Sequence, residues 1–285
     1  MSGLTPTRNP GPPSAAPTTT PTTTPTTAAA GSAGYRLSTR GVLRSEWHKL
    51  WTLRSTWISL GTAVALVLTV GVTMGVTYDG DDSDIDTVVF TLFGTQLSQV
   101  CLAVLGILVT AGEYSTGMIR ASLTAVPTRL SVLWSKAGLF TAVAFAVSLV
   151  TNVVTFLAAQ IWLSGSDKQL SLTDEGVFAA LTTSAASLTL LSLIALGLGA
   201  LLRSVPGAIG AFVGGVIILP EIVAMLPLDA IDTAVRYFPA QAGSALGSVA
   251  RVENTIAPGT ALLTLVLWSA AIIAAASVLL KRRDV

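Results

Sequence analysis

Side chains that carry out catalytic or metal chemistry are scarce in this chain of 285 residues. It contains one histidine, His48, and one cysteine, Cys101. A zinc site needs three or four ligands, and a disulfide needs a pair of cysteines, so the sequence excludes an intrachain version of either. It also holds no GxxxxGK[S/T] phosphate-binding loop and no HExxH motif. We therefore expect no enzyme, no catalytic residue, and no metal or cofactor bound by this chain.

The overall composition indicates the environment of the protein. Apolar residues make up 52% of the chain and charged residues only 11%, with a formal net charge of +1. Soluble domains average roughly a quarter charged residues. A near-zero net charge also disfavours binding to nucleic acid. The composition is that of an integral membrane protein.

Six long apolar runs provide the elements that position the remaining polar residues. Each is near or above the ~20 residues that a helix needs to cross a bilayer. The runs are 56–76, 88–110, 137–163, 177–202, 207–225 and 260–280. Because helices satisfy their own backbone hydrogen bonds in lipid, the sequence predicts an all-α integral membrane protein with six transmembrane helices. The spans carry almost no ionisable groups, so energy for any transport must come from a partner.

The basic residues predict how the chain is oriented. If both termini lie inside, the inner segments hold 13 of the 16 lysines and arginines. The positive-inside rule then predicts a multi-pass protein of the cell membrane with cytoplasmic N- and C-termini. Several aspartates, at positions 79–86, crowd the first outer loop.

Two segments precede the first span. Residues 1–34 are rich in Thr and Pro, which predicts a disordered cytoplasmic tail. Residues 35–55 combine apolar and basic positions at helical spacing, which predicts an amphipathic helix in the membrane interface that contacts lipids. The residues that carry this prediction are Arg44, Trp47, Lys49, Trp51 and Arg54. The alternative is that this segment only extends span 1 out of the bilayer. Residues 56–285 then form the six-helix domain.

Two further segments lie between spans. Gly112–Lys136 joins spans 2 and 3 on the inner side, with Glu113 at its start and Arg120 and Arg129 later. That order of charges suits a short docking helix, although an ordinary charged connector fits these residues equally well. The long outer stretch Pro227–Gly259 reads as short amphipathic helices.

Five short stretches within residues 40–285 resemble, in order, the ABC-2-type permeases, the membrane subunits of ATP-driven transporters, in particular actinobacterial members. They lie before span 1, after span 2, between spans 4 and 5, in the outer loop and at the C-terminus. The stretches are Ser45–Leu50 with Thr52–Trp57, Glu113–Lys136, Arg203–Pro220, Tyr237–Gly243 and Arg282–Asp284.

The resemblance implies a partner set and two groups of site residues. Two six-helix permeases, identical or paired with a sister subunit, would bind two separate ATP-binding cassette ATPase subunits, which hold ATP and Mg. The residues implied to couple to the ATPase are Glu113, Tyr114, Gly117, Ile119, Arg120, Pro127 and Arg129. The residues implied to lie in the outer gate region are Pro220, Glu221, Tyr237, Phe238 and Pro239.

The resulting hypothesis is a permease subunit that exports a hydrophobic or amphipathic compound. Substrates of such permeases include drugs, lipids, peptides, polysaccharides and ions, and the sequence does not choose among them. The alternative is a non-transporting membrane scaffold or immunity-type protein. An intramembrane enzyme is disfavoured because the spans lack catalytic groups.

Overall fold

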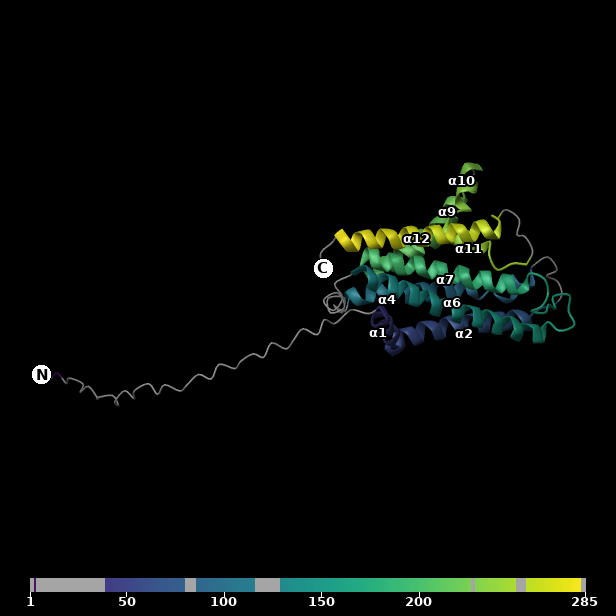
Figure 1. Cartoon of the computed structure of the whole chain (residues 1–285). Coiled ribbons are helices and arrows are strands. Elements are labelled where there is room, and N and C mark those ends of the chain that lie inside the picture. The colour runs from purple at the N-terminus through teal and green to yellow at the C-terminus, as the bar shows by residue number, and fades with distance from the viewer. Residues whose placement is uncertain are drawn as a thin grey trace. The chain divides into compact units, whose positions relative to one another are not determined.

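The computed structural model of the chain divides into two units, Met1–Arg36 and Leu37–Val285, and the fold below is that of the second. The structure describes residues 3, 39–79, 86–115, 129–226, 229–249 and 255–282. The predicted tail (apart from Gly3) and residues 116–128 of the predicted coupling segment therefore lie outside the described residues. Figure 1 shows the course of the chain.

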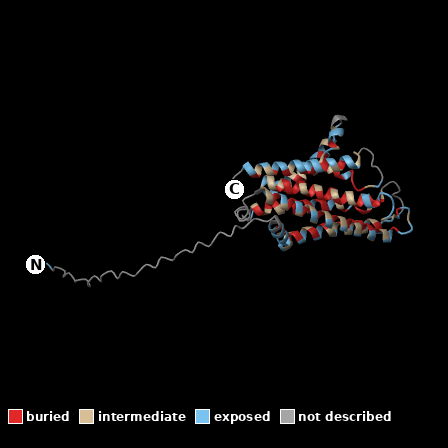
Figure 2. Ribbon diagram, viewed as in Figure 1, coloured by how far each residue is buried: buried red, intermediate tan, exposed pale blue. Residues whose placement is uncertain are grey.

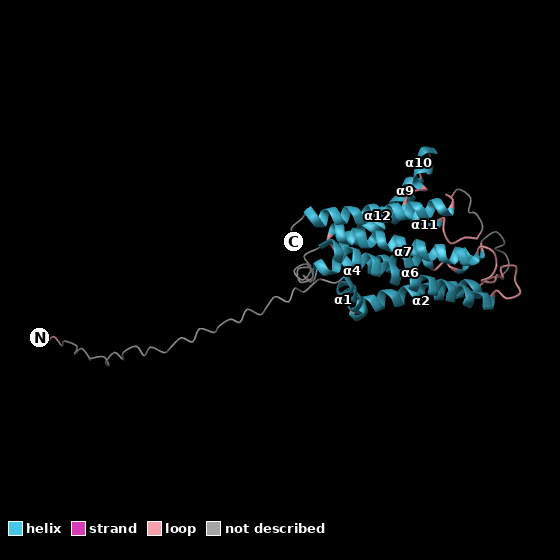
Figure 3. Ribbon diagram, viewed as in Figure 1, coloured by secondary structure: helices cyan, strands magenta, loops and turns pink. Residues whose placement is uncertain are grey.

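Long helices dominate the second unit, and no strand occurs among the described residues (Figure 3). The long helices are α2 (Arg54–Val76), α4 (Thr95–Ser115), α6 (Arg129–Trp162), α7 (Val177–Leu202) and α12 (Pro258–Arg282). The shorter helices are α1 (Thr39–Thr52), α3 (Thr87–Thr91), α8 (Val205–Gly210), η1 (Ala211–Ile218), α9 (Leu219–Ala224), α10 (Asp229–Val235) and α11 (Pro239–Ser244).

Six spans in the described part of the chain are long and apolar enough to cross a membrane, the fifth being the composite Val205–Ala224. This confirms the predicted helical, multi-pass membrane class. The fourth span has the predicted bounds, and the first and last differ by two residues at most at each end. The third begins earlier than predicted, at Arg129, because its first turns are buried: Val132, Leu133 and Lys136 pack into the structure.

The predicted single helix over 88–110 is wrong at its start. Residues there form the separate helix α3 and a turn at Leu92–Gly94 before α4 begins. The Asp86 side chain caps α3 by accepting hydrogen bonds from the backbone N–H groups of Val88 and Val89. At the turn, a Cβ on Gly94 would come within 2.8 Å of the Leu66 carbonyl oxygen on α2. The turn therefore depends on close approach to another helix.

The fifth span has an irregular centre. Its middle, η1, is a π-helix, in which the Leu219 N–H donates to the Gly214 carbonyl five residues back. Pro220 explains this widening, since it has no N–H for the Val216 carbonyl and its ring would clash with that group in a regular helix. The predicted span 207–225 is therefore present, but its backbone changes pitch twice.

Helix α7 lies at the centre of the bundle and packs against α4, α6 and α12, while α2 packs against α4 and α6. In Figure 2, buried residues lie on sides that face neighbouring helices, and exposed residues cover the outward side of α12. The exposed side chains include large apolar ones such as Ile58, Ile161 and Leu267. A belt of apolar side chains suits contact with lipid.

Glycines set the distance between α4 and α7. A Cβ on Gly106 would lie 2.5 Å from the Ser192 carbonyl oxygen, and one on Gly199 would lie 2.4 Å from the Thr110 hydroxyl oxygen. The Thr110 hydroxyl also donates a hydrogen bond of 2.9 Å to the Leu196 carbonyl. Small residues that let two backbones approach are typical of helix packing in membranes.

Candidate functional site

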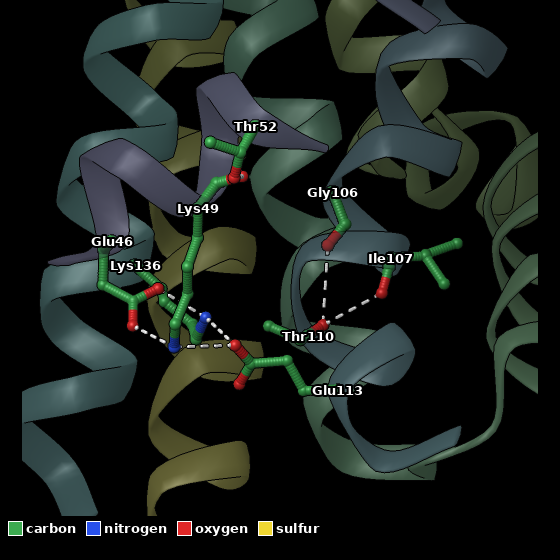
Figure 4. A network of polar contacts seen from close by, with 8 residues as sticks. All are labelled: Glu46, Lys49, Thr52, Gly106, Ile107, Thr110, Glu113 and Lys136. Carbon is green, nitrogen blue, oxygen red and sulfur yellow. Dashed lines mark hydrogen bonds and ion pairs between the residues drawn. The ribbon is translucent and has the colours of Figure 1, made fainter. Parts of the chain in front are cut away.

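Four charged side chains from three helices meet at one end of the bundle (Figure 4). Lys136 of α6 lies 2.5 Å from Glu46 Oε2 and 2.8 Å from Glu113 Oε1. Lys49 of α1 lies 2.9 Å from Glu46 Oε1 and 3.1 Å from Glu113 Oε1. Acids and bases therefore alternate around a closed ring, which we call the charge network, and its formal charges sum to zero.

The charge network is largely shielded from solvent. The exposed fractions are 5% for Glu46, 6% for Lys136 and 8% for Glu113, whereas Lys49 is partly exposed. Removing charged groups from water is costly, and only close pairing offsets that cost. The close pairing of these side chains therefore offsets part of the cost of burying them.

Lys49 lies on α1, outside the spans, and is the member of the charge network closest to solvent. Burial alone would lower the pKa of its ammonium group. Hydrogen bonding and Coulombic attraction from Glu46 and Glu113 together outweigh burial and raise the pKa above its ordinary value of 10.5. Lys49 is therefore charged throughout the neutral range, and its contribution to stability is lost only as the pH rises through that raised pKa.

Helix α1 presents its charged members to the bundle through its own periodicity. Glu46, Lys49 and Leu50 are spaced i, i+3 and i+4, so they share one face. Leu50 is buried beside the two charged residues, while Leu43 and Trp47 of the same helix are exposed. Helix α1 therefore leaves apolar surface exposed at Leu43 and Trp47.

A break at Leu53 separates α1 from α2, where the backbone is extended (φ −77°, ψ 121°). This segment and span 1 are therefore two helices rather than one continuous helix. Three indole rings brace the corner: Trp51 lies 5.3 Å from Trp47 and 4.8 Å from Trp57, centroid to centroid. The Trp57 indole N–H also donates to the Trp51 carbonyl at 3.0 Å.

A cavity of about 320 Å³ lies beside the charge network, between α1 and α4. All four charged residues line it, together with the apolar side chains Leu50, Leu53, Leu108 and Val109. Exposed residues, including Thr52 and Ser115, also line it, so the cavity opens to the surface. Its volume is at the small end of the range for small-molecule sites.

A second contact at the same end joins α4 to α7. The Arg203 guanidinium lies 5.0 Å from the centre of the Tyr114 ring, a cation–π geometry. Arg203 follows the last residue of α7 in the left-handed region (φ 54°), and its backbone N–H donates to the Gly199 carbonyl. Tyr114, predicted to couple to the ATPase, therefore contacts the loop between spans 4 and 5.

The structure brings together some predicted site residues and not others. Of the predicted coupling residues, Glu113 joins the charge network and Tyr114 contacts Arg203. Arg129 begins α6, but its side chain is not described, and Gly117, Ile119, Arg120 and Pro127 lie outside the described residues. Of the predicted interfacial residues, Lys49 turns into the charge network, whereas Arg44 and Arg54 are exposed.

Two members of the charge network, Glu46 and Lys136, were not among the predicted site residues. Lys136 has the appearance of a topology marker, since lysines commonly flank spans. The spacing of Glu46 with Lys49 and Leu50 was a usable signal, because an acid on a partly apolar face needs a basic partner.

The predicted outer gate residues lie in two places. Pro220 and Glu221 are on α9, which continues η1, whereas Tyr237 and Phe238 directly precede α11 and Pro239 begins it. Pro220 and Pro239 sit in the first turns of α9 and α11. The Gln241 amide donates to Glu221 at 2.7 Å, which ties α11 to α9. The Trp268 indole N–H donates to the Tyr237 carbonyl at 3.0 Å, and the Phe238 ring lies 6.3 Å from that of Trp268. Three of the five residues, Glu221, Tyr237 and Phe238, thus make contacts that join α9 to α11 and the segment before α11 to α12.

Comparison with known protein families finds no family model that matches the chain, and comparison with curated proteins finds no significant match.

Proposed function

We propose that this chain is the membrane-spanning permease subunit of an ATP-binding cassette transporter that exports a hydrophobic or amphipathic compound. A separate ATPase subunit supplies the energy, and a second permease copy or a sister permease completes the membrane part. The chain lies in the cell membrane with both termini in the cytoplasm. It follows the ABC-2 type of fold, with α1 as the interfacial helix.

The observation that carries this proposal is the position of the charge network relative to residues 116–128. Glu113 lies near the end of α4 and Lys136 near the start of α6, and these two helices flank that segment. Lys136 pairs with Glu46 of α1, and Glu113 pairs with Lys49 of α1. A force applied to the segment by a cytoplasmic ATPase would therefore reach α1 and two spans together.

Charge distribution supports the orientation in the proposal. With the charge network on the cytoplasmic side, 13 of the 16 basic residues of the whole chain lie inside. The exposed apolar side of α1, with Leu43 and Trp47, then lies at the level of the lipid headgroups.

Co-purification tests the proposed coupling to an ATPase. The wild-type chain, co-expressed with ATP-binding subunits encoded beside its gene, is expected to retain them through purification in mild detergent. Glu113→Arg places a cation against Lys49 and Lys136, so it is expected to lose the ATPase and the transport-dependent ATP hydrolysis.

Glu175→Arg is the matched control, because Glu175 is exposed between α6 and α7 and makes no contact with the charge network. It should retain the ATPase. Equal retention by wild type, Glu113→Arg and Glu175→Arg would overturn the coupling role. Failure of every ATP-binding subunit to co-purify would favour the scaffold instead.

Labelling of single cysteines tests the orientation separately. The test uses the Cys101→Ala variant with one new cysteine. In intact cells, a membrane-impermeant maleimide is expected to label a cysteine placed in residues 79–86 of this variant. A cysteine placed in residues 117–127 should react only after the cells are opened. The reverse pattern would invert the proposed orientation.

A further inference from the structure

Helix α6 carries a buried polar stripe midway along its length. Ser148, Thr151, Asn152 and Thr155 are spaced i, i+3, i+4 and i+7, so they lie on one face. Asn152 and Thr155 are fully buried, and Ser148 and Thr151 are nearly so. A neutral polar stripe at this depth faces other helices rather than lipid and must find hydrogen-bond partners there.

The stripe is only partly satisfied by the protein itself. The Asn152 amide donates to the Leu181 carbonyl of α7 at 3.2 Å. The Asn152 carbonyl oxygen and the hydroxyls of Ser148 and Thr155 have no hydrogen-bond partner in the part of the chain that the structure describes. Leaving a buried polar group without a partner costs about 1–3 kcal/mol. Other hydroxyls on the same helix avoid that cost: Thr141 donates to the Ala137 carbonyl.

A small cavity lies against two of these unpartnered atoms. It has a volume of about 10 Å³ and is bounded by Ser148, Thr151 and Asn152 of α6 and by Ser98 of α4. The rest of the wall is apolar and consists of Ala63, Val64, Val67, Leu102, Val147 and Leu188. That volume is about what one water molecule needs, and a buried water needs two to four polar partners.

We propose that this cavity between α2, α4, α6 and α7 is a binding site for one internal water molecule. The water donates to the Asn152 carbonyl oxygen and accepts from the Ser148 hydroxyl. Ser98, whose own hydroxyl donates to the Thr95 carbonyl at 3.1 Å, has lone pairs free to accept the second water proton. The ligand is neutral water rather than a cation, because the wall has only neutral oxygen groups and an uncompensated ion at this depth is costly.

A second polar cavity lies next to this site. It measures about 40 Å³ and is lined by Thr95, Gln96 and Gln99 of α4, Ser184 and Ser187 of α7, and α11 residues including Ser244. Leu188 lines both cavities. We expect water to exchange between the two cavities past this one leucine.

Radiolytic hydroxyl-radical labelling in ¹⁸O-water, read by mass spectrometry on the full chain in nanodiscs, tests the site. Leu102 and Leu188 line the small cavity and are expected to take up label. Leu265, which is also buried but lines neither cavity, is not. Labelling of the wild-type cavity residues no greater than that of Leu265 would overturn the proposal, and this comparison needs no variant.

Two variants sharpen the result. Ser148→Val removes a hydrogen-bond partner of the water and fills the cavity, so labelling of Leu102 should be lost. Leu188→Ala joins the two cavities and should raise the labelling of Leu102. Ser277→Ala, which removes a hydroxyl that already donates to the Ile273 carbonyl, should leave Leu102 labelling unchanged. Exchange of Na⁺ for choline in the buffer should leave the thermal unfolding temperature unchanged. A lower unfolding temperature in choline would indicate that the cavity binds a cation and would refute the proposed water site.

Discussion

Replacing Lys136 with methionine is expected to lower the free energy of unfolding by about 3–5 kcal/mol, because it leaves buried carboxylates without their cation. Glu46 and Glu113 are both nearly buried, and Lys136 lies within hydrogen-bonding distance of each. After the change, Lys49 alone faces two carboxylates. Equilibrium unfolding of the purified chain in mixed micelles measures the loss.

Lys281→Met is the matched control, since Lys281 is exposed at the end of α12, and it should change the unfolding free energy little. Adding Glu46→Gln to Lys136→Met removes one of the stranded charges, so the double variant should recover part of the loss. Additive losses, or a Lys136→Met variant as stable as Lys281→Met, would show that the charge network does not act as a unit.

Replacing Gly106 with valine is expected to destabilise the bundle by about 3 kcal/mol, because the new side chain overlaps the backbone of α7. Its Cβ alone would lie 2.5 Å from the Ser192 carbonyl oxygen and 3.2 Å from the Leu196 backbone nitrogen. The two helices must separate, which also breaks the hydrogen bond from Thr110 to the Leu196 carbonyl. The same unfolding measurement, with the yield of monodisperse protein, reports the effect.

Gly138→Val provides the control for helix propensity. Gly138 lies in α6, and a Cβ built there meets no atom within 4 Å, so only the small intrinsic difference between glycine and valine in a helix remains. Equal stability of Gly106→Val and Gly138→Val would mean that α4 and α7 are not in close contact at Gly106.

The sequence was sufficient for the spans because their length and hydropathy are local properties. Val177–Leu202 could be predicted to the residue, since a loop with polar and glycine residues precedes it and Arg203 follows it. The turn at Leu92–Gly94 could not, because it depends on how closely Gly94 approaches α2. The π-helix before Pro220 forms because the proline has no N–H to continue the regular hydrogen-bond pattern of the span. Hydropathy alone does not indicate that the backbone changes from α-helix to π-helix there.

The candidate site was harder to predict than the spans. Glu113 could be singled out because it lies at the end of span 2, but its partners could not. Glu113 and Lys136 are 23 positions apart in the sequence. Lys136 and Glu46 are 90 positions apart. Such pairs depend on which helices are neighbours, and a single sequence contains no direct signal for that. Lys136 was therefore taken for a flanking residue, although it lies inside the fold.

The separation of Glu46 and Lys136 along the chain also bears on how the protein is made. The ribosome completes α1 and the first two spans before it reaches Lys136, 90 residues after Glu46. Until then Glu46 and Glu113 share only Lys49, and burying both acids is unfavourable. Docking of α1 is therefore expected to wait for the third span, although α1 precedes that span in the chain by two spans.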